Sequence, residues 1–189
     1  MTVSDERPGL ADLARDITIG ENAVFPATRL VPLAPPAGVD DLPRYLHALR
    51  RLADADDLAA AHSGCTLAVD VAGRDGSAAG LAMAYSQRSS VARRLGRLAD
   101  ALRDADASAE LLAVSGTDPA GPAAALVLAR RLAVLLDLGD LDLADSLLTA
   151  TGLDGDLPDE PEFLLLRYVR GLLHTAAARP GEGLAELYR

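Results

Sequence analysis

The sequence contains no lysine, and all 18 basic residues in its 189 positions are arginine. A phosphate-binding P-loop requires a lysine beside the phosphates, and a Schiff-base enzyme requires a lysine amine as its nucleophile. Both kinds of chemistry are therefore excluded for this chain. The single cysteine, Cys65, excludes an intrachain disulfide and favours a reducing, cytoplasmic location.

Aromatic residues are scarce, at 3% of the chain, and tryptophan is absent, whereas 50% of the residues are hydrophobic. The core must therefore be built from leucine, alanine and valine, which is typical of closely packed helices. The longest apolar segment, 123–136, is interrupted by Arg130 and Arg131. Because a bilayer span needs roughly 18 consecutive apolar residues, we expect no contact of this chain with the membrane interior.

The formal net charge of −10 argues against direct contact with nucleic acid. Such contact requires a basic surface, and the arginines here alternate with acidic residues, as in the segment from Arg93 to Asp100. We therefore expect partners other than DNA or RNA. Acidic composition of this kind favours solubility.

Four segments share one layout: an apolar helical stretch, a tight turn, and a small residue five positions after the turn. The turns are predicted at Asp56, Gly96, Gly139 and Ala178, about 40 residues apart. The small residues that follow are Ala61, Ala101, Ala144 and Gly183, and the residues seven positions before the turns are Leu49, Ser89, Leu132 and Gly171. We predict an all-α fold of antiparallel helix-hairpin repeats, a right-handed α-solenoid of about four hairpins resembling tetratricopeptide repeats (TPRs).

The chain is predicted to divide into an irregular, proline-containing segment, 1–40, and a helical-repeat domain, 41–189. The first expected helix begins near Asp41. The next two hairpins are expected to pair helix 78–95 with helix 98–114, and helix 119–138 with helix 141–151. A helix over 160–177 and a final helix that includes Leu184 follow. Pro119 is expected to open its helix behind the cap Asp118, and Asp159 with Glu162 has capping-box spacing.

The final helix is expected to be shorter than its equivalents in the earlier hairpins. This pattern predicts that the chain ends inside an element and is a fragment, or an early-stopped reading frame, of a longer protein. An apolar helix face without its next partner would then be exposed at the C-terminal end, and we expect it to favour self-association.

Three arginines, Arg88, Arg131 and Arg170, lie eight positions before the turn in successive hairpins. If they line one groove, they form a site for an acidic ligand or peptide. The alternative is that they cover neighbouring helices or pair with nearby carboxylates. Sequence spacing alone leaves both interpretations open.

No catalytic, metal or cofactor site is expected. His62 and Cys65 are three residues apart on one predicted helix, but Cys65 falls on the apolar face, where a packed cysteine is the simpler interpretation. His47 and His174 lie on different hairpins and lack ligand spacing. The acidic loop 154–162 has Pro158 where a calcium loop needs an oxygen ligand.

Five segments carry a more specific likeness: 94–103 (RLGRLADALR), 138–148 (LGDLDLADSLL), 150–159 (ATGLDGDLPD), 163–171 (FLLLRYVRG) and 178–187 (ARPGEGLAEL). Together they resemble the helical-repeat region of the large ATP-dependent LuxR-family transcriptional regulators, the MalT-like group. In that family an ATPase module precedes a TPR-like sensor arm, and a DNA-binding helix-turn-helix follows it.

The resemblance implies that this chain is a non-catalytic sensor or protein-interaction arm that lacks both flanking modules. It would bind a protein partner or a small effector and need no cofactor. A freestanding TPR-like scaffold for protein partners is the alternative. A third hypothesis, a small hydrolase-like enzyme that uses Cys65 or a pair of carboxylates, is disfavoured because no constellation of catalytic residues can be argued from the sequence.

Overall fold

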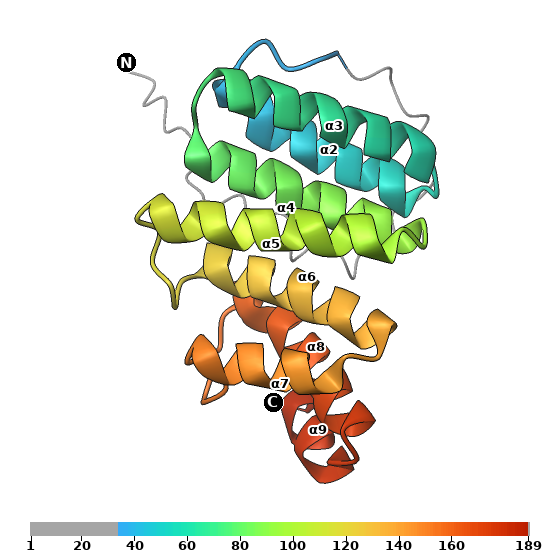
Figure 1. Cartoon of the computed structure of the whole chain (residues 1–189), viewed down its shortest axis with the longest axis vertical. Helices are drawn as coiled ribbons and strands as arrows, with labels where there is room; N and C mark the ends of the chain where they lie inside the picture. Colours follow the sequence, from blue (N-terminus) through green and yellow to red (C-terminus); the bar gives the residue numbers. More distant parts are fainter. Residues whose placement is uncertain (1–33, 189) are drawn as a thin grey trace, which may run out of the picture.

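The computed structural model describes residues 34–188 (Figure 1). The α-helices in this part of the chain are α2 (Leu42–Asp54), α3 (Leu58–Arg74), α4 (Ala78–Arg94), α5 (Leu98–Val114), α6 (Pro122–Leu138), α7 (Leu141–Ala150), α8 (Leu164–Ala176) and α9 (Pro180–Leu187). Short 3₁₀ helices, η1 (Val39–Asp41) and η2 (Pro161–Phe163), precede α2 and α8. The described residues contain no β-strand. Most of the predicted segment 1–40 lies outside them.

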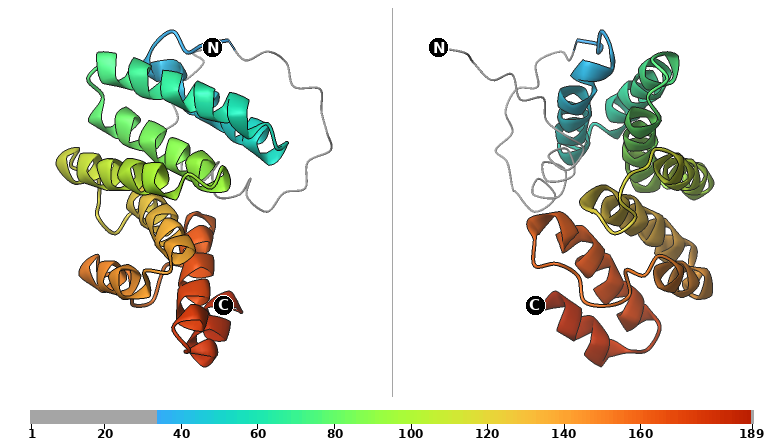
Figure 2. Two further views of the ribbon diagram at one scale, coloured as in Figure 1. Left: turned by 45° about the vertical axis from the view of Figure 1, so that its right-hand side comes forward. Right: turned by 90° about the vertical axis from the view of Figure 1, so that its left-hand side faces the viewer.

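Successive helices pair as four hairpins, α2–α3, α4–α5, α6–α7 and α8–α9, which are stacked along the molecule (Figure 1). The prediction of an all-α array of helix hairpins is therefore confirmed. The first helices also contact one another, α2 with α4, α4 with α6, and α6 with α8. The second helices α3, α5 and α7 lie along the opposite side of the stack (Figure 2).

Each predicted turn residue adopts a left-handed backbone conformation. The φ angles are 65° at Asp56, 73° at Gly96, 75° at Gly139 and 60° at Ala178. In each hairpin the N–H of the next residue donates to the carbonyl five positions earlier, as from Arg97 to Ala92, which is the hydrogen bond of a Schellman motif. The same local geometry thus ends the first helix of every hairpin.

The small residues predicted after the turns lie where the two helices of a hairpin pack closely. All four are buried: Ala61, Ala101, Ala144 and Gly183. In the second hairpin the hydroxyl of Ser89 donates to the carbonyl of Ala101 at 2.8 Å. In the last hairpin a Cβ on Gly183 would lie 2.7 Å from the carbonyl oxygen of Gly171. Two of the predicted pairs, seven before and five after the turn, therefore meet across their helices.

Two helix starts differ from the prediction. Helix α6 begins at Pro122 instead of Pro119, because the Asp118 carboxylate accepts from the N–H of Ala120 and closes a separate turn first. Helix α8 begins at Leu164, and Asp159 pairs with an arginine of α8 instead of capping the helix. In both places a local turn intervenes between the proline-containing loop and the helix.

The buried apolar residues form two main clusters along the stack. One is centred on α2, α3 and α4, with Leu46 and Met83 fully buried, and the other on α6, α7 and α8, with Leu135 and Leu166 fully buried. Helix α6 contributes to both clusters and so joins the two halves of the stack. At the C-terminal end Leu184, Leu187 and Tyr188 are exposed, and self-association through this end stays a prediction.

Candidate ligand-binding groove

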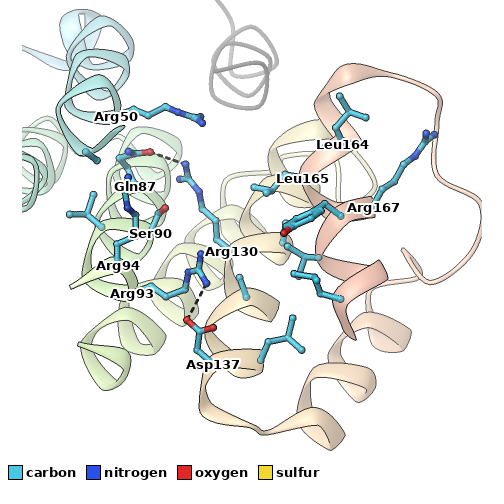
Figure 3. A pocket seen from close by; sticks show the side chains of 18 of the residues that line it. Arg50, Gln87, Ser90, Arg93, Arg94, Arg130, Asp137, Leu164, Leu165 and Arg167 are labelled. Atoms are coloured by element: carbon cyan, nitrogen blue, oxygen red, sulfur yellow. Dashed lines mark hydrogen bonds and ion pairs between the residues drawn. The ribbon is translucent and has the colours of Figure 1, made fainter. Parts of the chain in front are cut away.

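A groove of about 610 Å³ runs along the side of the molecule formed by the first helices, α2, α4, α6 and α8, and α9 borders it with Glu186 and Leu187 (Figure 3). One position of the repeat recurs along it. Arg50, Ser90, Ala133 and Leu172 each lie six residues before the turn of their hairpin, and all four line the groove. The groove is therefore a product of the repeat and not of an irregular insertion.

Two ion pairs cross between neighbouring hairpins at the edge of the groove. Arg93 on α4 pairs with Asp137 on α6 at 3.1 Å, and Arg94 on α4 pairs with Asp54 on α2 at 3.5 Å. All four side chains are partly exposed, so each pair contributes at most about 1 kcal/mol to stability. Their main effect is to orient the guanidinium groups and to neutralise them locally.

Arg130 on α6 differs from these edge arginines. Its side chain is only 5% exposed, and its partners are neutral: Nη1 donates to the Ser86 hydroxyl at 2.9 Å and Nη2 to the Gln87 side-chain oxygen at 2.8 Å. Its Nε has no hydrogen-bond partner among residues 34–188. Burial lowers the pKa of Arg130 to about 10, so the group still carries its charge at neutral pH.

Arg50 on α2 brings a second guanidinium to the same region, as Figure 3 shows. It is 4% exposed, and its Nε lies 3.6 Å from the Asp54 carboxylate of the same helix. Burial lowers the pKa of Arg50 to about 10, and the positive charge of Arg130 acts in the same direction. The two guanidiniums are therefore close enough to repel each other.

The opposite wall of the groove is apolar and belongs to α8. Leu164, Leu165, Tyr168 and Leu172 line it, and Tyr168 is 52% exposed. Leu164 and Leu165 lie across the groove from the arginines in Figure 3. Arg167, also on α8, is directed to the loop before the helix, where it pairs with Asp159 at 3.1 Å. One side of the groove thus carries cations and the other carries exposed apolar surface.

The three arginines singled out by the sequence do not line this groove. Arg88 forms two hydrogen bonds of 2.7 Å with the Asp104 carboxylate, which raise the pKa of Arg88, and its guanidinium lies over the Tyr85 ring at 5.1 Å. Arg131 pairs with Asp106 at 2.6 Å. The structure thus places both arginines in ion pairs with α5, and a further role in ligand binding stays a prediction.

Arg170 is buried and organises the loop between α7 and α8. It donates to the carbonyl oxygens of Leu153, Asp154 and Gly155 at 2.8–2.9 Å and to the Glu186 carboxylate at 2.6 Å. One guanidinium therefore holds both a loop and the last helix. The groove is lined instead by Gln87, Arg130 and Val169, each one residue before a predicted arginine.

Cys65 is fully buried in the first core cluster. Burial raises the pKa of its thiol to about 12, which keeps the thiol protonated at neutral pH. Burial also lowers the pKa of the neighbouring His62, with the charge of Arg97 as the next cause. This environment suits a packed cysteine and disfavours Cys65 as the nucleophile of the hydrolase hypothesis.

Within residues 34–188, no three histidine, cysteine or acidic side chains are grouped as metal ligands would be. In the same part of the chain, no helix combines the length and the apolar character that crossing a bilayer requires.

The fold and the groove define a class of protein: an all-α helical-hairpin repeat with a groove along its first helices. We compared the chain with models of protein families, with curated proteins and with solved structures, and none of the three comparisons found a match. The resemblance to LuxR-family regulators therefore rests on the sequence segments alone.

Proposed function

We propose that this chain is a non-catalytic binding arm of a transcriptional regulator, of the kind that the LuxR-family resemblance implies. The observation that carries the proposal is the groove along α2, α4, α6 and α8, to which every hairpin contributes the same repeat position. Arrays of helical repeats use such continuous surfaces to bind partners. The arm would bind a protein partner or a small effector there.

A ligand in this groove would contact the first and the last hairpin at once. Arg50 lies on α2 and Leu172 on α8, and the helices between them are linked by partly exposed ion pairs. Binding would favour the relative hairpin arrangement that fits the ligand best, because a ligand shifts a conformational equilibrium by its difference in affinity. Modules attached at either end would then sense the ligand through that arrangement.

The alternative is a freestanding TPR-like scaffold, and one observation favours it. The described residues of α2, α4, α6, α8 and α9 by themselves supply both the cationic and the apolar side of the groove. The two hypotheses differ in what the gene encodes on either side of these residues.

The test is to sequence the source DNA across both ends of the reading frame. An in-frame P-loop ATPase upstream and a helix-turn-helix downstream would support the regulator arm. Stop codons and a ribosome-binding site that bracket the frame would support the scaffold. Flanking modules of any other class would refute the regulator proposal.

A second experiment tests the groove itself in the complete regulator. Ala133→Trp would fill the groove at α6, whereas Ala59→Trp places the same side chain on the exposed surface of α3. We expect Ala133→Trp to abolish the effector response of DNA binding and Ala59→Trp to preserve it. Equal responses of the two variants would show that signalling does not use the groove.

A further inference from the structure

The groove holds a buried cation without an acidic partner in a strongly acidic chain. Its described lining residues include five arginines, of which Arg93, Arg94 and Arg50 lie beside the lining carboxylates Asp137 and Asp54, and Arg167 is directed to Asp159. Arg130 is the one that pairs with no carboxylate among residues 34–188. The whole chain carries a formal net charge of −10. A local concentration of the minority charge in a concave site attracts a ligand of the opposite sign.

Arg130 supplies the strongest evidence for the nature of that ligand. Burying a cation without a carboxylate partner is unfavourable by several kcal/mol in general, because the protein interior replaces its hydration poorly. Here the buried guanidinium has only the Ser86 hydroxyl and the Gln87 amide as partners among the described residues, and its Nε is left over. An anion bound in the groove beside the guanidinium would offset the burial of its charge.

The Arg50 guanidinium adds positive charge close to Arg130. It reaches the same side of the groove from α2, where its Nε lies 3.6 Å from the Asp54 carboxylate, and its charge opposes that of Arg130. An anion bound at Arg130 would therefore also be attracted by Arg50. Guanidinium groups are well suited to this role, since they bind carboxylates through paired N–H donors.

The rest of the groove fits an apolar body. Leu165, Tyr168 and Leu172 of α8 lie along the wall opposite the arginines, and Tyr168 and Leu172 are exposed. A cavity volume of about 610 Å³ falls in the range of small-molecule sites, roughly 300–1,000 Å³. The acidic residues of the lining would repel a head group of high charge, so a single negative charge fits best.

We propose that the groove binds a small amphipathic carboxylate, with its carboxylate on Arg130 and Arg50 and its aliphatic or aromatic body against Leu165, Tyr168 and Leu172. This inference rests on the proposed function and names the chemical class of the effector. The volume of about 610 Å³ and the presence of one buried, carboxylate-free cation among the described lining residues favour a small molecule over an extended acidic peptide.

The experiment is a titration of the full chain with octanoate, using 1-octanol and butanoate as probes that lack the charge or most of the body. Isothermal calorimetry should show octanoate binding at least tenfold more tightly than either. Arg130→Gln should weaken octanoate binding at least tenfold. Arg103→Gln, which removes the same charge from the exposed face of α5, should leave it within twofold.

A purely structural role for Arg130 predicts a different result. In that case Arg130→Gln would lower the thermal midpoint of the free protein, whereas we expect it unchanged or raised, because a buried cation without a carboxylate is removed. Tyr168→Ser provides a second test that leaves Arg130 in place. It should reduce the preference for octanoate over butanoate.

Three results would overturn the inference. Equal octanoate binding by Arg130→Gln and Arg103→Gln would show that the anion binds elsewhere. Equal binding of 1-octanol and octanoate would show that the charge is not recognised. Binding of an alternating Glu-Leu octapeptide, with no binding of octanoate, would replace the small carboxylate by an acidic peptide. In that last case the chain would still be a binding arm, and the flanking DNA decides the proposed function separately.

Discussion

Gly64 allows α3 to approach α2, and replacing it with alanine tests the packing of the first hairpin directly. A Cβ at this position would lie 2.2 Å from Cδ2 of Leu49 and 3.2 Å from the Tyr45 hydroxyl oxygen. Leu49 is 1% exposed and belongs to the core, so it has no solvent-facing space into which to move. Gly64→Ala therefore requires Leu49 to leave its rotamer or the helices to separate.

The magnitude follows from two opposing terms. Overpacking of a well-packed core costs about 1–3 kcal/mol. Alanine in a helix interior is more favourable than glycine by about 0.8–1 kcal/mol. The expected net loss for Gly64→Ala is therefore about 0–2 kcal/mol of unfolding free energy. Gly73→Ala is the matched control in the same helix, since a Cβ there has no neighbour within 4 Å.

Urea unfolding followed by circular dichroism measures both variants. The gain in helix propensity from glycine to alanine is shared by both variants, although it is weaker at Gly73 near the helix end. The difference in unfolding free energy between the two variants therefore reports the cost of overpacking, about 1–3 kcal/mol. In a Leu49→Ala background the space is vacant, and Gly64→Ala should then increase stability. If Gly64→Ala stabilises the parent as Gly73→Ala does, the α2–α3 packing described above is incorrect.

Three further predictions concern other parts of the stack. Ala178→Gly should raise the unfolding free energy by about 0.5–1 kcal/mol, because φ at this residue is 60°, a conformation that glycine adopts without strain. Ala177→Gly, where φ is −80°, should lower the unfolding free energy by a similar amount, and equal urea midpoints for the two variants would contradict this. In urea unfolding, Arg88→Ala should lower the unfolding free energy by about 1.5–3 kcal/mol and Arg131→Ala by under about 1 kcal/mol. The reason is that Arg88→Ala leaves the largely buried Asp104 carboxylate unpaired, whereas Asp106, the partner of Arg131, is partly exposed; the reverse order would refute these two ion pairs. Cys65 should react with a thiol reagent only when the protein unfolds, and rapid reaction of the folded protein would exclude its burial. Because burial raises the pKa of the thiol to about 12, the stabilisation that Cys65 contributes should be complete below pH 9 and decline as the pH rises toward about 12.

The hairpins could be predicted from the sequence because the signal was repeated. At Gly96 and Gly139 a glycine after an apolar stretch already indicates a helix end. At Asp56 and Ala178 no glycine is present, and only the shared spacing identified the turns that the structure confirms. The helix starts were harder to predict. The segment around Asp118 contains two competing turn signals, and hydrogen bonds over a few residues decide which one opens the helix.

The groove could not be predicted from the sequence, because spacing places residues on a common helix face without showing what that face contacts. Successive residues differ by about 100° around an α-helix, so Arg130 and Arg131 point in different directions. Arg131 turns to α5, and Arg130 turns to the groove and α4. The signal that could have indicated the groove was the position six residues before each turn. This position is occupied by Arg50 in the first hairpin and by Leu172 in the last.

That recurring position also shows how a regular stack could bind the asymmetric ligand proposed above. Along the four hairpins it is occupied in turn by Arg50, Ser90, Ala133 and Leu172, so the groove changes from cationic to apolar along its length. The small residues that hold each hairpin together stay small throughout, because close packing of the helices requires it. The groove-facing position has no such requirement and is able to vary. If the groove binds a ligand as proposed, specificity would reside in the positions where the repeats differ.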